Sequence, residues 1–329
     1  MNHSLFHPQR RALIAAAAWL VAAALPGAAS AQAYPAKTIT FVVPFAAGSA
    51  TDQLARALGQ SISEQTKKAV VIDNKAGASG MLAAQWAARA APDGYTVLIA
   101  TNTTQAANEH LYKKLPYHPV TDFAPVTGLG KGGQILVVNA NSPYKTVAEL
   151  LAMARSNPGK LSFGSGSASS RVAGELLKQL SGVDILHVPY KSNPLAITDL
   201  LGGQIDLMVT DTSTGMPQVK SGKLRALGYS VQKRSVQLPD LPTLAEAGVK
   251  GYELGYWFAA YVPAGTPPAV IARLSELLHI GVKSAPAKLF FDTAGSEAWT
   301  TTPDELARFQ ASETLKWGKV IKAAGIEAE

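Results

Sequence analysis

The stretch ITFVVPFAAGSATDQLARALGQSI occupies residues 39–62 and decides the fold class. Its first five residues are apolar or β-branched, which is typical of a buried strand. Leu54, Leu58 and Ile62 then recur at helical spacing, after a short loop made mostly of small residues. A strand that passes through a short loop into an amphipathic helix is the repeating unit of α/β proteins.

The same alternation of strand and helix continues along the chain. Further strands are expected at residues 70–72, 96–99, 135–138, 161–163, 185–188 and 205–209. Helices are expected at residues 81–91, 146–156, where Thr146 is a capping residue, 172–180 and 197–201. Two further helices are expected to start at Thr266-Pro267 and Thr302-Pro303, each with a capping Thr and with Pro at its first helical position. Residues 115–131 are expected to be irregular. The alternation predicts mainly parallel α/β sheets that bind ligands at the carboxyl ends of their strands.

Composition limits the classes of protein that fit. Hydrophobic residues make up 47% and charged residues 16% of the 329 residues, so we expect a folded chain with a core. The 30 basic residues, against 23 acidic ones, are spread along the chain without the clustered stripe of a nucleic-acid binder. The chain has no cysteine, which excludes disulfides, cysteine-ligated zinc, iron–sulfur clusters and cysteine nucleophiles.

The N-terminus has the pattern of a secretory signal peptide. Arg10 and Arg11 precede an uninterrupted apolar run from Ala12 to Leu25, and small residues follow up to Ala33. The run is shorter than the roughly 20 residues of a membrane-spanning helix. We expect residues 1–33 to be a signal peptide that is cleaved near Ala33, which places the mature protein in the periplasm. The two arginines leave both general secretion and twin-arginine export open.

The remaining length predicts two lobes. Removal of the signal peptide leaves 329 − 33 = 296 residues, which is a large number for one open sheet. No internal repeat or low-complexity tract is present to suggest a different organisation.

The first loop, residues 44–52, is one of two that suit an anion. Its small residues let a ligand approach the backbone N–H groups at the start of the following helix. Asp52 complicates this reading, because a carboxylate in the first turn repels an anion. It caps backbone N–H groups, holds a bridging water or pairs with a cationic part of the ligand. The competing interpretation is an ordinary capped turn between strand and helix.

The second loop, residues 164–171, reads GSGSASSR and also joins a strand to a helix. Its hydroxyl and N–H groups suit an oxyanion, and Arg171 could clamp a carboxylate. The competing interpretation is a flexible loop with a solvated Arg171. Asn102 and Asp211 also follow strands, which places their side chains at carboxyl ends.

No motif for catalysis or for a cofactor stands out. Residues 128–133 read GLGKGG and look like part of a dinucleotide fingerprint, but they precede a strand where a helix is required. The four histidines outside the signal peptide show no metal-binding spacing, and no G-x-S-x-G nucleophile elbow occurs. We therefore expect a binding protein that is not an enzyme and holds neither cofactor nor metal.

A series of motifs in order resembles one family. They include residues 39–45 (ITFVVPF), 91–95 (APDGY), 111–117 (LYKKLPY), 188–191 (VPYK), 199–204 (DLLGGQ), 241–248 (LPTLAEAG) and 263–268 (PAGTPP). The family comprises the solute-binding proteins of tripartite tricarboxylate transporters, also called Bordetella uptake gene proteins. The resemblance extends from Tyr34 to Ile326.

The resemblance implies a two-lobed "Venus flytrap" fold of the type II periplasmic-binding-protein class. Lobe 1 would comprise residues 34–137 and 258–329, lobe 2 residues 138–257, and the ligand cleft would lie between them. The family grips a carboxylate with its two anion loops, which implicates Phe45, Ala47, Gly48, Ser49, Thr51 and Asp52 in lobe 1 and Ser165, Ser167, Ala168 and Ser169 in lobe 2. The partners implied are a small carboxylate and integral-membrane permease subunits, with no nucleic acid, and we expect a monomer.

Departures from the family pattern bear on specificity. The first loop has Ser49 where a second glycine is usual, the second helix has Arg171 where histidine is common, and residues 192–195 replace Gly-Ser-Ala-Pro. As a hypothesis, Arg171 meets a second carboxylate and favours a dicarboxylate, which is aromatic if Phe45, Tyr190 or Trp257 lines the cleft. The alternative is that Arg171 points outward.

Two other functions remain open at this point. A periplasmic sensor would present its closed form to a receptor kinase in place of a permease. A hydrolase would turn over carboxylic esters, but no pair of nucleophile and base is visible in the sequence.

Overall fold

The structure is a computed structural model that describes residues 34–235 and 238–329. The signal peptide expected at residues 1–33 lies outside the described residues. Residues Lys37–Glu329 form one compact body.

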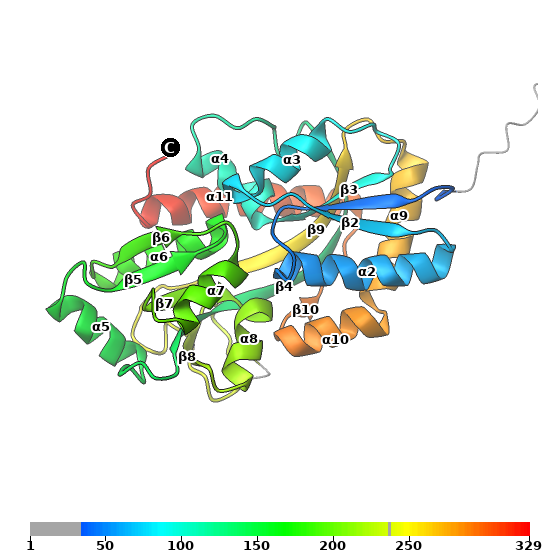
Figure 1. Ribbon diagram of the computed structural model, residues 1–329. Helices are drawn as coiled ribbons and strands as arrows, with labels where there is room; N and C mark the ends of the chain where they lie inside the picture. Colours follow the sequence, from blue (N-terminus) through cyan, green and yellow to red (C-terminus); the bar gives the residue numbers. More distant parts are fainter. Residues whose placement is uncertain (1–33, 236–237) are drawn as a thin grey trace, which may run out of the picture. The chain divides into compact units, whose positions relative to one another are not determined.

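One continuous mixed sheet organises this body (Figure 1). Its main strand order is β2-β1-β3-β9-β4-β7-β5-β6, and β8 and β10 each pair with β4. The strands are β1 Ile39–Val43, β2 Val70–Asn74, β3 Thr96–Thr101, β4 Phe123–Asn139, β5 Ser162–Ser165, β6 Leu186–Pro189, β7 Leu207–Asp211, β8 Leu224–Tyr229, β9 Gly255–Pro263 and β10 Glu297–Ala298.

Helices pack on this sheet and connect its strands. They are α2 Ala50–Thr66, α3 Met81–Ala88, α4 Asn108–Leu111, α5 Val147–Ser156, α6 Ala168–Ser181, α7 Asn193–Leu201, α8 Thr212–Lys220, α9 Pro268–Val282, α10 Ala285–Ala294 and α11 Pro303–Ala323, with short turns η1 Ala78–Gly80 and η2 Thr103–Ala107. Helix α2 packs against α9 and α10, which come from the end of the chain. No helix among residues 34–235 and 238–329 is long and apolar enough to cross a membrane.

Strand β4 joins the two halves of the sheet. Its residues Phe123–Gly133 pair with β9, whereas Gln134–Val138 pair with β7 and Ile135–Asn139 pair with β8. The pairing partner therefore changes between Gly133 and Gln134, a few residues before the lobe boundary predicted at residue 137. The lobe boundaries themselves remain a prediction.

Two expectations about the sheet are corrected. The α/β class is confirmed, but the sheet is mixed, because β4 and β9 run antiparallel to their neighbours and only the outer strands pair in parallel. The expected irregular stretch, residues 115–131, contains the first half of β4. Its glycines, which disfavour a strand by propensity, let aromatic rings lie directly on the backbone. A Cβ at Gly128, Gly130, Gly132 or Gly133 would meet Trp299, Phe291, Tyr256 or Tyr229.

The helix starts predicted from capping residues are mostly confirmed. Thr302 and Glu305 form a capping box at the start of α11, and Thr146 caps α5. Thr266 was expected to cap α9, but Pro267 is the N-cap there. The Thr266 hydroxyl donates instead to the carbonyl of Pro263, at 2.7 Å.

Candidate functional site

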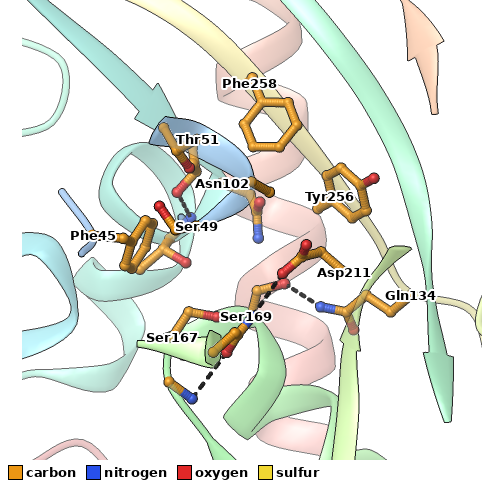
Figure 2. Close-up of a pocket in the computed structure, with 15 residues that line it drawn as sticks. Phe45, Ser49, Thr51, Asn102, Gln134, Ser167, Ser169, Asp211, Tyr256 and Phe258 are labelled. Carbon is orange, nitrogen blue, oxygen red and sulfur yellow. Dashed lines mark hydrogen bonds between the residues drawn. The ribbon is translucent and has the colours of Figure 1, made fainter. Parts of the chain in front are cut away.

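A cavity lies where the two halves of the sheet meet (Figure 2). Its volume is about 40 Å³. The residues that line it are Phe45, Ser49, Ala50, Thr51, Thr101, Asn102, Thr103, Gln134, Gly166, Ser167, Ser169, Asn193, Asp211, Tyr256 and Phe258.

The loop after β1 presents the first turn of α2 to the cavity. Ser49 is the N-cap, and its hydroxyl accepts from the N–H of Asp52 at 3.3 Å. Ala50 and Thr51, the next two residues, line the cavity. Because N–H groups in a first turn have no partner within the helix, this end of α2 offers donors and a positive dipole end to a ligand.

Asp52 stabilises that loop from the side that faces away from the cavity. Its Oδ2 accepts from the N–H of Gly48 at 2.9 Å and from Nε of Arg56 at 3.0 Å, and its Oδ1 accepts from Nδ2 of Asn74 at 3.0 Å. Burial alone would raise the pKa of Asp52, but these hydrogen bonds outweigh it and the pKa is lowered. The carboxylate does not line the cavity, so of the roles considered for it the structure supports capping of the loop.

The loop after β5 presents the first turn of α6 from the other half of the sheet. Ser167 and Ser170 form a capping box, and Ser167 and Ser169 line the cavity. Gly166 is required here, because a Cβ would overlap the backbone of Ser192 and Asn193 at the start of α7. The two helix ends therefore meet in one cavity.

Polar side chains complete the walls between the two helix ends. Asn102, which is 1% exposed, accepts from the N–H of Trp257 through Oδ1, and its Nδ2 has no hydrogen-bond partner. Gln134 donates to the hydroxyl of Ser169 at 2.8 Å. Asp211 caps α8 and accepts from Nδ2 of Asn193 at 2.8 Å. Figure 2 shows Asn102 and Asp211 reaching into the cavity from different elements.

The aromatic lining comes from Phe45 and from one face of β9. Tyr256 and Phe258 line the cavity, whereas Trp257 between them points to the opposite face and donates from Nε1 to Glu313. Side chains alternate along a strand, so of the aromatic residues considered for the cleft Phe45 lines the cavity and Trp257 does not. Tyr190 does not line the cavity either. Its hydroxyl donates to Asp199 at 2.8 Å, and its pKa is raised to about 12 by burial and by that carboxylate.

Arg171 takes neither of the two roles predicted for it. Its Nη1 lies 2.6 Å from Oε1 of Glu329, and the side chain is 23% exposed. It is absent from the cavity lining, which rules out a carboxylate clamp in this structure, and it is not a solvated side chain. The backbone of Glu329 is held in turn by hydrogen bonds with Leu111 and Lys113.

The electrostatic character of the cavity comes from the backbone. No Lys, Arg or His is among its lining residues, and Asp211 is the single acid there. The helices α2 and α6 place the positive ends of their dipoles and their free N–H groups at the cavity. This arrangement can hold a carboxylate by hydrogen bonds without an ion pair.

Comparison with known proteins agrees with this geometry. Residues 54–326 match the family model of the tripartite tricarboxylate transporter family receptor. The chain belongs to this receptor family. The resemblance read from the sequence motifs is thereby confirmed.

Three solved structures resemble this receptor along most of its length. Rpa4515 of R. palustris, solved with adipate, is 34% identical with a TM-score of 0.87 and covers 90% of this chain and 100% of its own. The periplasmic binding protein BugD is 33% identical with a TM-score of 0.86 and the same coverage. MatC of Rhodopseudomonas palustris, with bound malate, is 30% identical with a TM-score of 0.83 and covers 88% of this chain and 100% of its own. These likenesses confirm the binding-protein fold.

About half of the residues that the sequence predicted to bind the ligand line the cavity of this receptor. Phe45, Ser49, Thr51, Asn102, Ser167, Ser169 and Asp211 line it. Ala47 and Gly48 are exposed, Ala168 is buried in the first turn of α6, and none of the three is in the lining. The Ser165 hydroxyl lies 2.7 Å from Nε2 of His187 and outside the lining.

Several lining residues were not predicted, and the signals for them differ. Ala50, Thr101, Thr103 and Gly166 directly adjoin predicted positions, so the loops themselves pointed to them. Asn193 lies within the stretch that departs from the family pattern. Gln134, Tyr256 and Phe258 come from the crossing strands, and no sequence motif marks them.

Proposed function

We propose that this receptor is a periplasmic solute-binding protein that captures a small carboxylate and delivers it to membrane permease subunits. The observation that carries the proposal is the meeting of two helix N-termini, α2 and α6, in one cavity with the free Nδ2 donor of Asn102. Adipate in Rpa4515 and malate in MatC support a carboxylate, and dicarboxylic acids are the first to test. BugD is a periplasmic binding protein, which supports the proposed location of this receptor.

The proposed mechanism is closure of two lobes on the ligand. Residues 34–137 and 258–329 would form lobe 1 and residues 138–257 lobe 2, with each lobe contributing one helix end. Hinge bending at the crossing strands β4 and β9 would bring these ends together, bury the carboxylate and create the surface that a permease recognises. The protein would act as a monomer and carry out no chemical reaction on the ligand.

A charge placed in the first turn of α2 tests the capture site. Thr51 lines the cavity and Asp is close to it in size, so Thr51→Asp adds a carboxylate where the ligand carboxylate is proposed to bind. Like charges brought together in a buried site cost several kcal/mol, so the affinity for the best-bound carboxylate should fall by about a hundredfold or more. Isothermal titration with residues 34–329 measures this, after a thermal-shift screen of mono-, di- and tricarboxylates.

The matched control is Gln53→Asp, which adds the same charge to the same helix turn at an exposed position outside the cavity. It should change the affinity by less than about threefold, because exposed charges are screened. Equal losses in the two variants, or no carboxylate binding by the unmodified protein, would contradict the proposal. Delivery is tested separately, by uptake of the bound carboxylate in cells that lack this protein.

A further inference from the structure

The anion-suited cavity contains a buried carboxylate, that of Asp211, which is 9% exposed. Its Oδ1 accepts from the N–H of Thr214 at 2.8 Å and from the Thr214 hydroxyl at 2.7 Å, and its Oδ2 accepts from Nδ2 of Asn193 at 2.8 Å. A carboxylate has about four acceptor positions, so Oδ2 keeps one for another donor. Next to this atom a ligand must present a hydrogen, because a second anion would be repelled.

The orientation of the Asn193 amide group determines whether Asp211 donates or accepts hydrogen bonds. Its Oδ1 accepts from the N–H of Gly166 at 3.0 Å and from the Ser170 hydroxyl at 3.0 Å. Because a backbone N–H can only donate, the amide oxygen of Asn193 must face Gly166 and its nitrogen must face Asp211. Asp211 is therefore held as an acceptor.

Asn102 supplies the complementary group. Its Oδ1 faces the N–H of Trp257, which can only donate, so Nδ2 is directed away from that backbone and has no partner. Buried donors without a partner are costly and rare in proteins. The cavity thus combines a free donor, Asn102 Nδ2, with a free acceptor position on Asp211 Oδ2, and Oε1 of Gln134 is a second acceptor there without a partner.

We propose that the ligand is a hydroxycarboxylate whose hydroxyl accepts from Asn102 and donates to Asp211, while its ionised carboxylate lies at the ends of α2 and α6. This inference rests on the proposed function and deepens it. A hydroxyl both donates and accepts, so one group satisfies both side chains. An ammonium has three hydrogens to donate and accepts none, so it would leave Asn102 unpaired. A carboxylate or ketone oxygen would face Asp211 without a hydrogen between them.

The test compares acids that differ only at this group. Residues 34–329 are titrated with lactate and pyruvate, with 2-hydroxyglutarate, 2-oxoglutarate and glutamate, and with malate and succinate. The hydroxy acid should bind about tenfold to a hundredfold more tightly than its oxo, amino or unsubstituted counterpart, since a site built around a hydroxyl leaves polar groups unpaired with the analogue. Equal affinity within the pairs, or tightest binding by an oxo, amino or unsubstituted acid, would overturn the inference.

A charge-swapped variant sharpens the test. The double substitution Asn193→Asp and Asp211→Asn keeps the hydrogen bonds to Gly166, Ser170 and Thr214 and the net charge, but position 211 then donates into the cavity where it accepted before. The ratio of hydroxy-acid to oxo-acid affinity should fall at least about tenfold, because a ketone oxygen can now accept from position 211. An unchanged ratio in a folded variant would overturn the inference.

The two proposals fail in different ways. If no carboxylate of any kind binds, the proposed function is wrong. If carboxylates bind and Thr51→Asp abolishes that binding, but hydroxy and oxo acids are not distinguished, only the assignment of the hydroxyl to Asp211 and Asn102 is wrong. The comparison within the unmodified protein decides this even if the swapped variant does not fold.

Discussion

The loops that precede α2 and α6 have the same geometry but are stabilised by different kinds of hydrogen-bonding group. Each follows a strand, each ends in a serine N-cap, and each contributes its first helical turn to the cavity. The first is held by an ionised side chain, Asp52, with three hydrogen-bond donors around it. The second is held by neutral groups, the Ser167/Ser170 capping box and the amide of Asn193.

Both loops turn their charged residue away from the cavity. Asp52 faces Arg56 and Asn74, and Arg171 faces Glu329. What lines the cavity from both loops is hydroxyls and backbone, apart from Phe45. From these two loops an anion would therefore meet hydroxyls and fixed backbone dipoles, because the charged side chains of both loops are paired with other residues.

The largest difference between the loops should appear when a methyl group is added to a glycine of each. Gly166→Ala forces a Cβ into the backbone at the start of α7 and should destabilise the protein by about 3 kcal/mol or more. Gly48→Ala meets no atom within 4 Å and strains only a φ of +80°, for about 1–2 kcal/mol. Urea unfolding of both variants measures the contrast. Equal decreases in the free energy of unfolding would show that the second loop accommodates a methyl group as easily as the first.

The next effect concerns the charge that holds the first loop. Asp52→Asn places an amide hydrogen opposite other donors and should cost about 2 kcal/mol at neutral pH. The pKa of Asp52 is lowered in the folded protein, so its contribution is present above the ordinary value of 3.8 and disappears as the pH falls through the lowered value.

Chemical unfolding between pH 7 and pH 3 follows this contribution. The stability gap between the unmodified protein and Asp52→Asn should stay constant down to about pH 4 and narrow below it. Ser167→Ala in the second loop removes a neutral cap and provides the control, since its cost of about 1 kcal/mol should not depend on pH. A gap for Asp52→Asn that widens in acid would contradict the assigned direction.

The smallest effect is expected at Arg171. Arg171→Ala removes a partly exposed ion pair with Glu329, so the stability should fall by about 1 kcal/mol or less. Carboxylate affinity should stay within about twofold, because Arg171 does not line the cavity. A dicarboxylate titration checks this. A large loss specific to dicarboxylates would restore the clamp hypothesis, and Glu329→Gln, which breaks the same ion pair, should match Arg171→Ala.

Sequence patterns located the two loops but not the walls between them. Strand and helix periodicity and runs of small residues are local, so both loops could be predicted, although α6 begins at Ala168, inside the stretch predicted as the second loop. Gln134, Tyr256 and Phe258 come from β4 and β9, where nothing local distinguishes cavity-lining side chains from core. The glycines of β4 led to the wrong prediction of an irregular stretch at residues 115–131. The aromatic residues that pack on these glycines lie far away in the sequence, so no local pattern reveals them.

The sequence by itself determined the α/β class, the receptor family and the two loops that contribute to the cavity, because periodicity and motifs act over a few neighbouring residues. Only the tertiary structure decided which side of each loop faces the cavity. Asp52 is hydrogen-bonded to Asn74, Arg171 forms an ion pair with Glu329, and Asp211 is hydrogen-bonded to Asn193. A partly buried charged side chain points toward the group that pairs with it, because an unpaired buried charge is costly. The position of that group is known only from the folded structure.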